Sequence, residues 1–257
     1  MVPVTQQEKD SSLYKYYELD MVPAPPEKYA MAEKPADPAL ALHPSDMNKL
    51  FDEGYLPLEV GFCNLPDGGG TLANLTPMPG VTPEMFDFWF AWHGVEPMRY
   101  KIWNHDDHYY CLTQNMDRAL DKSLSLKERY WDTTHHVEED VGMGKEKIFI
   151  NFRNPVDIGF DPVKLADFKG TIVCAGNEHS PTIMCHFLRP VEGGCELRTR
   201  FWMGYSVIDG KPKKILPDGV QFPLEPVQAL LRHNIKEFTN LAAILPKVYA
   251  EFKDSFC

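Results

Sequence analysis

Residues 224–252 read LEPVQALLRHNIKEFTNLAAILPKVYAEF and predict one long helix near the end of a 257-residue chain. At about 100° of rotation per residue, the large apolar side chains fall on a single arc that extends from Val227 to Leu245. His233 and Glu237 lie one turn apart and fall inside this arc rather than on the polar face. An imidazole and a carboxylate that face a protein core need a polar partner or a ligand, because unpaired polar groups are costly to bury.

The sequence before this helix indicates an antiparallel sheet. Short segments rich in β-branched and aromatic residues follow one another at 147–153, 171–175, 182–188 and 196–207. In the last segment, alternation places Tyr205 on the same face as Leu197 and Phe201. A curved antiparallel sheet closed by a long C-terminal helix predicts an α+β fold of the helix-grip type, with a ligand cavity between helix and sheet.

Further upstream, residues 56–77 predict a β-hairpin around a glycine-rich turn. A helix should follow, with Thr82 as its N-cap and Gly94 at its end. Its body is so rich in aromatic residues, including Trp89, that we expect it to be buried or to line an aromatic cavity.

Residues 1–55 have a different composition, with five prolines between positions 23 and 38. Such frequent prolines exclude long helices and central strands. We therefore divide the chain into an N-terminal arm or small subdomain, 1–55, and a main domain, 56–257. A short helix is expected near 45–53. Three tyrosines at positions 14–17 favour ordering of the arm against a second subunit, and a disordered tail is the alternative.

The bulk composition limits the partners and the location of the protein. A net charge of −11 argues against nucleic acid and against a basic membrane-docking face. The chain has no run of about 18 apolar residues, and its first residues lack the pattern of a signal peptide. The six cysteines are scattered without a Cys-x-x-Cys pair, which favours reduced thiols. We expect a cytoplasmic protein that binds neither nucleic acid nor membranes.

Two further segments concentrate chemically active side chains. Residues 100–110, YKIWNHDDHYY, combine two imidazoles, two carboxylates and four aromatic rings, and residues 133–140 read TTHHVEED. Such a mixture suits neither a core nor an ordinary surface, so we expect these segments to meet the long helix around one divalent metal. The candidate ligands are His108, Glu139, His233 and Glu237. Mixed imidazole and carboxylate ligation suits zinc, with iron(II) or manganese as substitutes.

Each of these signals also has a simpler explanation. The helical His233 and Glu237 could be a hydrogen-bonded core pair, the run from His105 to His108 a polar loop, and residues 135–139 a solvated strand end. Signatures of common hydrolases and nucleotide-binding proteins are absent from the sequence. The residues alone therefore leave both interpretations open.

Four motifs together resemble the diacetylphloroglucinol hydrolase and phloretin hydrolase family. They are Tyr100-Lys-Ile-Trp-Asn-His-Asp-Asp-His-Tyr109, His135-His-Val-Glu-Glu139, His186-Phe-Leu-Arg189 and His233-Asn-Ile-Lys-Glu237. The resemblance extends from about residue 56 to the C-terminus. It implies a birch-allergen (Bet v1-like) fold, an N-terminal part used in dimerisation, and a zinc ion. It also implies hydrolysis of the carbon–carbon bond between a polyhydroxylated aromatic ring and an acyl group.

Carried over by position, the resemblance assigns the metal to His108, Glu139, His233 and Glu237. His105 and Glu138 remain substitutes for the first two. Tyr100 matches a tyrosine that contacts the phenolic oxygens of the substrate. Cys111 stands where the resemblance leads us to expect a substrate-contacting asparagine, which leaves the identity of the acyl group open.

The implied chemistry is attack of metal-activated water on an aryl ketone, followed by departure of a ring carbon. An acid must protonate that carbon, and His186 is our candidate, although a hydrogen-bonded strand histidine is the alternative. Tyr100 and Tyr205 would hold the phenolic oxygens, and the helix around Trp89 would supply apolar walls.

Two other functions compete with this hypothesis. The same cavity could serve a non-catalytic carrier of apolar aromatic ligands, which would have no need of inward-facing histidine and glutamate. A metal-dependent cyclase or decarboxylase acting on polyketide-like rings would share the metal and the cavity but not the product.

Overall fold

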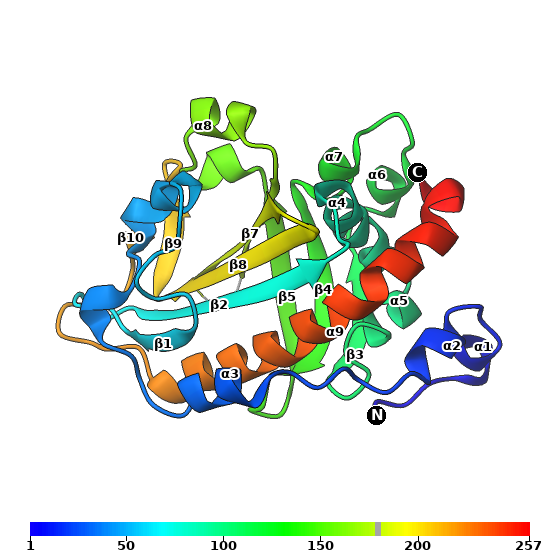
Figure 1. The fold of residues 1–257 in the computed structure, drawn as a ribbon, viewed down its shortest axis with the longest axis horizontal. Coiled ribbons are helices and arrows are strands. Elements are labelled where there is room, and N and C mark those ends of the chain that lie inside the picture. The colour runs from blue at the N-terminus through cyan, green and yellow to red at the C-terminus, as the bar shows by residue number, and fades with distance from the viewer. Residues whose placement is uncertain (178–180) are drawn as a thin grey trace.

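The fold is built on one large antiparallel sheet, described here from a computed structural model that covers residues 1–177 and 181–257. Within this part of the chain the sheet has eight strands in the order β1-β2-β8-β7-β6-β5-β4-β3 (Figure 1). Their bounds are Gly61–Asn64 (β1), Gly70–Pro79 (β2), His108–Thr113 (β3), Thr133–Asp140 (β4), Lys145–Arg153 (β5), Thr171–Asn177 (β6), Thr182–Val191 (β7) and Gly194–Met203 (β8). A separate two-stranded sheet pairs Tyr205–Ile208 (β9) with Lys211–Lys214 (β10).

Most of the helices are short and surround this sheet. They are Gln6–Lys9 (α1), Tyr14–Tyr17 (α2), Pro26–Met31 (α3), Pro83–Trp92 (α4), Pro97–Lys101 (α5), Met116–Leu120 (α6), Leu126–Tyr130 (α7) and Pro162–Asp167 (α8). The 3-10 helices are Pro38–Leu40 (η1), Pro44–Phe51 (η2), His93–Val95 (η3) and Pro155–Ile158 (η4). Among the described residues, no helix combines the length and the apolar character needed to cross a membrane.

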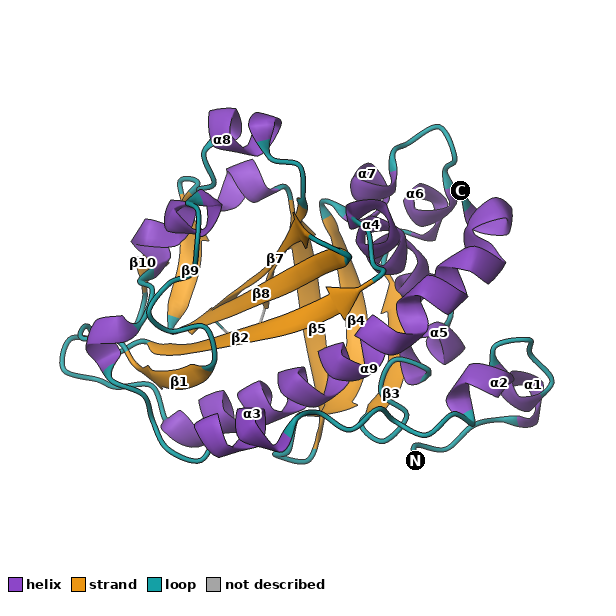
Figure 2. Cartoon of the chain, viewed as in Figure 1, coloured by secondary structure: helices purple, strands orange, loops and turns teal. Residues whose placement is uncertain are grey.

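The predicted C-terminal helix is α9, Leu224–Phe256. Figure 2 shows that it spans the molecule from the end near β1 to the end near α4. Its apolar arc is fully buried at Leu231, Phe238 and Leu245. A large antiparallel sheet covered by a long C-terminal helix confirms the predicted α+β class.

The β-hairpin and the aromatic helix are also confirmed. β1 and β2 pair across the glycine-rich turn, with Asn64 opposite Gly70. The Thr82 hydroxyl accepts a hydrogen bond from the Met85 amide and caps α4. The helix ends at Trp92, and Gly94 lies in the 3-10 turn that follows.

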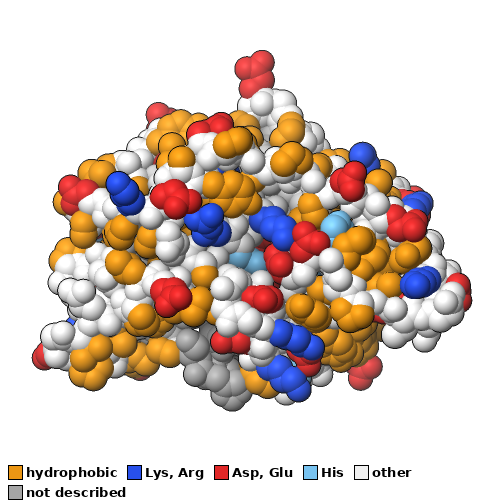
Figure 3. Space-filling model, turned by 90° about the horizontal axis from the view of Figure 1, so that it is seen from below, with side chains coloured by type: hydrophobic (Ala, Val, Ile, Leu, Met, Phe, Trp, Pro, Cys, Tyr) orange, Lys and Arg blue, Asp and Glu red, His pale blue; other side chains and the backbone are white. Residues whose placement is uncertain are grey.

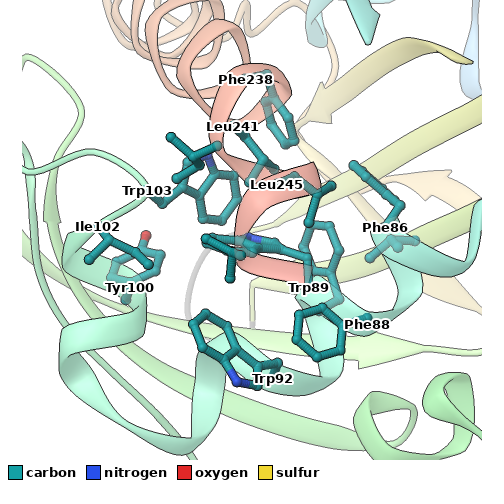
Figure 4. Packing of buried hydrophobic residues seen from close by; sticks show 14 of the residues in the cluster. Phe86, Phe88, Trp89, Trp92, Tyr100, Ile102, Trp103, Phe238, Leu241 and Leu245 are labelled. Atoms are coloured by element: carbon teal, nitrogen blue, oxygen red, sulfur yellow. The ribbon is translucent and has the colours of Figure 1, made fainter. Parts of the chain in front are cut away.

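The aromatic side chains of α4 form the centre of the main core. Phe86, Phe88, Trp89 and Trp92 are all buried, and Figure 4 shows them packed beneath Phe238, Leu241 and Leu245 of α9. Aromatic rings bury the largest areas of any side chains, so this contact contributes strongly to holding α9 against the rest of the protein.

The N-terminal arm packs on its own chain. Tyr16 and Tyr17 join the main core, and the Tyr16 hydroxyl donates to Glu251 of α9. Helix α3 lies beside α9 (Figure 1), where Gln228 donates to the Ala32 carbonyl. The short helix expected near 45–53 is the 3-10 helix η2. The division into separate domains and the role of the arm in dimerisation stay predictions.

The predicted face for Tyr205 is wrong. β8 ends at Met203, and Gly204 adopts a positive φ of 87° that breaks the alternation. Tyr205 therefore lies with Trp202 in a second core on the opposite side from Leu197, and its hydroxyl donates to Asp67.

A buried ion cluster lies on the same side of the sheet as the second core. Arg198 and Arg200 are each 1% exposed, and both contact Glu59, at 2.5 Å and 2.6 Å. Burial alone would raise the pKa of Glu59, but the hydrogen bonds and charges of the two arginines hold this pKa below its ordinary value. One carboxylate thus compensates two buried guanidinium groups.

Replacement of Glu59 by alanine should lower the free energy of unfolding by about 3–5 kcal/mol, because two buried cations lose their partner. Denaturant unfolding measures this effect, with the exposed Glu53→Ala as the control. Since the pKa of Glu59 is depressed in the folded state, its contribution is complete above the unfolded pKa and is lost as the pH falls through the folded value. Equal stability of the two variants at neutral pH would contradict this account.

Candidate metal centre

Three elements bring four ligand-type side chains to one buried point. β3 begins at His108, whose Cα pairs with that of Glu139 on β4. Helix α9 presents His233 and Glu237 from successive turns of its buried face. Each of the four residues is 8% exposed or less. Strand pairing and the helical repeat therefore bring together residues that are far apart in the sequence.

The ligand atoms of His108, His233 and Glu237 all lie within 4.8 Å of one another, close enough to hold one metal ion, and Oε2 of Glu139 lies near both imidazoles. Nε2 of His108 lies 3.3 Å from Nε2 of His233, 3.5 Å from Oε2 of Glu237 and 3.7 Å from Oε2 of Glu139. Nε2 of His233 lies 3.7 Å and 3.9 Å from the same two oxygens. Tetrahedral zinc bonds of about 2.0–2.1 Å separate ligand atoms by roughly 3.3–3.4 Å. Coordination by all four residues would require the side chains to move closer together, Glu139 and Glu237 above all.

Neighbouring groups orient these ligands. The imidazole Nδ1–H of His108 donates to the Tyr100 carbonyl at 3.2 Å, which leaves Nε2 with its lone pair toward the other ligands. The Tyr100 ring stacks on that imidazole at 3.9 Å, and its hydroxyl donates to Glu139. Asn234 donates to Oε1 of Glu237 at 3.1 Å, so that Oε2 remains available.

The electrostatics of the cluster favour a cation. Burial, and then the charge of His233, lower the pKa of His108 well below its ordinary value, and burial lowers the pKa of His233. Burial, and then the charge of Glu139, raise the pKa of Glu237 well above its ordinary value. Two neutral imidazoles and two repelling carboxylates thus face one another, and Nδ1 of His233 has no hydrogen-bond partner within the described structure. This donor set fits zinc, iron(II) or manganese.

A cavity of about 210 Å³ adjoins the four ligands between the sheet and α9. Its walls are mainly apolar and include Phe90, Trp103 and Ile148. Tyr100 and His186 add polar groups to the cavity lining. An apolar cavity with a few converging polar groups is typical of sites for small molecules.

His186 projects from β7 into this cavity, and its Nδ1 lies 3.0 Å from the Thr199 hydroxyl. Burial lowers the pKa of His186 to about 3, so its imidazole is neutral at neutral pH. It can therefore take part in proton transfer as a neutral group rather than as a stored imidazolium.

Three predicted substrate contacts lie away from the cavity lining. Trp89 is buried in the main core, and its neighbour Phe90 lines the cavity instead. Tyr205 lies in the second core. Cys111 is fully buried, with its sulfur 3.7 Å from Nδ1 of His135.

The two substitute ligands point elsewhere. His105 contacts the Leu19 carbonyl at 3.1 Å, and Glu138 pairs with Lys145. β4 alternates without a break, which directs Glu139 inward with His135 and Val137 and leaves Glu138 on the other face. A register shift in β3, between His108 and Tyr110, accompanies the pairing of His108 with Glu139.

Sequence reasoning missed His93, which lines the cavity. Its ring Nδ1–H donates to the Trp89 carbonyl at 2.9 Å. His93, Cys111 and His135 form a second buried group whose potential ligand atoms lie within 4.8 Å of one another. The only sequence signal was the position of His93 directly after the aromatic helix.

A surface hollow also reaches His233, one of the four candidate ligands. Figure 3 shows this face, with a histidine at the floor of a hollow surrounded by acidic and basic side chains. The hollow is lined by Asp107, Asp140, Arg232 and Lys236, and it shares His233 with the inner cavity. The candidate centre thus lies between an apolar cavity and a charged opening.

Comparison with known proteins identifies relatives of the chain. The model of the DAPG hydrolase PhiG domain matches residues 42–250. A phloretin hydrolase from Eubacterium ramulus is 40% identical over 263 aligned residues, which cover 99% of this chain and 95% of that protein. A 2,4-diacetylphloroglucinol hydrolase from Pseudomonas sp is 28% identical, with 80% of this chain and 76% of that protein covered.

The His135 ring packs directly on the backbone of Gly94, and a Cβ there would lie 2.3–2.8 Å from ring atoms. Gly94→Ala should therefore displace the ring and lower the free energy of unfolding by about 1–3 kcal/mol. Gly176→Ala is the control, because its Cβ would meet no atom closer than 3.5 Å. Thermal unfolding and the NMR shifts of His135 measure the effect, and an unperturbed Gly94→Ala protein would contradict the packing.

Proposed function

The chain belongs to the DAPG hydrolase family, and from this premise we propose that it hydrolyses the carbon–carbon bond between an acyl group and a phloroglucinol-type ring. The substrate class is that of phloretin and diacetylphloroglucinol, after which its relatives are named. The observation that carries the proposal is the convergence of His108, Glu139, His233 and Glu237 beside an apolar cavity. A non-catalytic carrier would not need such a set.

Zinc, or iron(II) or manganese in its place, is the ion that these four residues would hold. When bound, it supplies Lewis acidity that activates water and polarises the ketone of the substrate. The four side chains fix the position of this chemistry at one end of the cavity. The aromatic walls accept a flat ring and exclude bulk water from it.

Tyr100 is proposed to bind a phenolic oxygen of the substrate. Burial, followed by the charges of Glu139 and Glu237, raises the pKa of Tyr100 well above its ordinary value, so its hydroxyl keeps the proton that it donates to Glu139, and its oxygen can accept a hydrogen bond from a phenolic hydroxyl of the substrate. Cleavage expels a ring carbon, and flanking phenolic oxygens delocalise the charge that develops. His186, neutral and on the same cavity, is the proposed group that passes a proton toward that carbon.

The resemblance also underlies three broader proposals. The sheet and α9 would correspond to a Bet v1-like helix grip, supported by the cavity between them. A homodimer that uses the arm and a cytoplasmic location complete the proposal. Light scattering of the full chain and of a variant that lacks the arm tests the dimer.

We expect about one zinc or iron per purified chain and cleavage of phloretin to an aryl-propionic acid and phloroglucinol. Elemental analysis and mass spectrometry of the products, each with and without a chelator, measure both. Metal without cleavage would keep the site and redirect the search to diacetylphloroglucinol. Absence of both would favour a carrier of aromatic ligands.

His233→Ala and Glu139→Ala should each lose bound metal and lower the cleavage rate by more than about 100-fold while remaining folded, because several kcal/mol of transition-state stabilisation depend on the ion. Glu138→Ala is the matched control, since its side chain points away and pairs with Lys145. Full activity in a metal-free His233→Ala protein would refute the mechanism.

A further inference from the structure

The N-terminal arm buries a lysine of α3 against strand β2. Lys28 of α3 is 9% exposed, and burial lowers its pKa to about 8. Its ammonium group donates to the amide oxygen of Asn74 at 3.1 Å and to the hydroxyl of Thr76 at 3.3 Å. These acceptors on β2 are neutral, so simple ion pairing with them does not explain why a charged group is buried here.

A continuous line of hydrogen bonds leads from Lys28 to the candidate metal centre. Nδ2 of Asn74 donates to Oδ1 of Asn234 at 2.9 Å, across the contact between β2 and α9. Nδ2 of Asn234 then donates to Oε1 of Glu237 at 3.1 Å. Both asparagines are 0% exposed, so bulk water does not compete for these groups.

The chemistry of the lysine sets the direction of this line. A protonated lysine can only donate, whereas each asparagine amide has one accepting and one donating end. With Lys28 at the start, Asn74 must turn its oxygen toward Lys28 and its nitrogen toward Asn234. The same constraint makes Asn234 present its nitrogen to Glu237. Without the lysine, only the hydrogen bonds from Nδ2 of Asn74 to Thr76 and Asn234 would oppose a rotation of both amides that places an oxygen against the carboxylate.

We propose that Lys28 is a positioning residue for the metal centre, which through Asn74 and Asn234 keeps a hydrogen-bond donor on Oε1 of Glu237 and so leaves Oε2 for the metal. This inference rests on the proposed role of Glu237 as a ligand. The inference gives the N-terminal arm a function in its own subunit, because α3, docked on α9, supplies the first donor in the line of hydrogen bonds.

The charge of Lys28 and the hydrogen bonds that it orients have opposite expected effects on the metal affinity. A nearby positive charge repels a divalent cation. Its removal should therefore, by charge alone, tighten the binding of the metal. Loss of the oriented hydrogen bonds should weaken binding, and partners of metal ligands typically contribute a factor of about 10–100 in affinity. The direction of the change therefore separates the two effects.

The first test compares Lys28→Met with Lys34→Met, which removes the same charge from an exposed position in the arm. Competition with a chromophoric chelator gives the zinc Kd of each full-length protein, and the visible spectrum of the cobalt-loaded proteins reports ligand geometry. We expect binding about tenfold weaker and an altered spectrum for Lys28→Met only. Binding that is unchanged or tighter would overturn the inference.

A second variant guards against simple misfolding. Asn74→Asp gives Lys28 an ion pair, so the thermal stability of the protein should be kept. The new carboxylate, however, can only accept hydrogen bonds. Asn234 must then turn its nitrogen toward it and its oxygen toward Glu237. We expect weaker zinc binding although a negative charge has been added, and equal or tighter binding would overturn the inference.

The wild type distinguishes failure of this inference from failure of the proposed function. Wild-type protein without measurable zinc affinity would overturn the metal centre and the inference together. Wild-type protein that binds zinc, with variants that bind equally well, would overturn the inference alone.

Discussion

The central constraint on this structure is that two glutamates and two histidines, Glu139, Glu237, His108 and His233, share one buried point. Burial raises the pKa of Glu237 and lowers that of His108, so the cluster gains no neutralising charge from its own histidines. A divalent cation would relieve the repulsion between Glu139 and Glu237, and the ligand atoms of His108, His233 and Glu237 lie within 4.8 Å of one another. The fold is arranged to hold these groups together: the β3–β4 pairing sets one half of the cluster, and the buried face of α9 sets the other.

The position of α9 follows from packing on both of its sides. Aromatic residues of α4 hold its apolar face, while the N-terminal arm covers it through α3 and through the contact of Tyr16 with Glu251. The cavity on the inner side is apolar and the hollow on the outer side is charged. The centre thus offers an apolar environment, which suits an aromatic substrate, and a charged environment, which suits a small ion. The hydrogen bonds that end on Glu237 connect the N-terminal arm to this centre.

Helical and strand periodicity predicted much of this arrangement. The turn-to-turn spacing of His233 and Glu237 was visible in the sequence, and so were the hairpin and the long helix. Local breaks in the pattern were not visible: Gly204 reverses the face of Tyr205, and the register shift after His108 places that residue opposite Glu139. Trp89 and Phe90 could not be told apart as cavity residues, because apolar and aromatic side chains make up most of α4. The roles of His93 and Lys28 depend on contacts between distant segments, for which periodicity carries no information.

The most direct test of the central claim is X-ray absorption spectroscopy at the metal edge of the zinc-loaded protein. The account predicts a first shell of nitrogen and oxygen atoms at about 2.0–2.1 Å, with the outer-shell signal of two imidazoles. The chain contains a second group of ligand-type residues, His93, Cys111 and His135, that would add sulfur. A sulfur scatterer at about 2.3 Å would therefore place the ion there and contradict the assignment to His108, Glu139, His233 and Glu237.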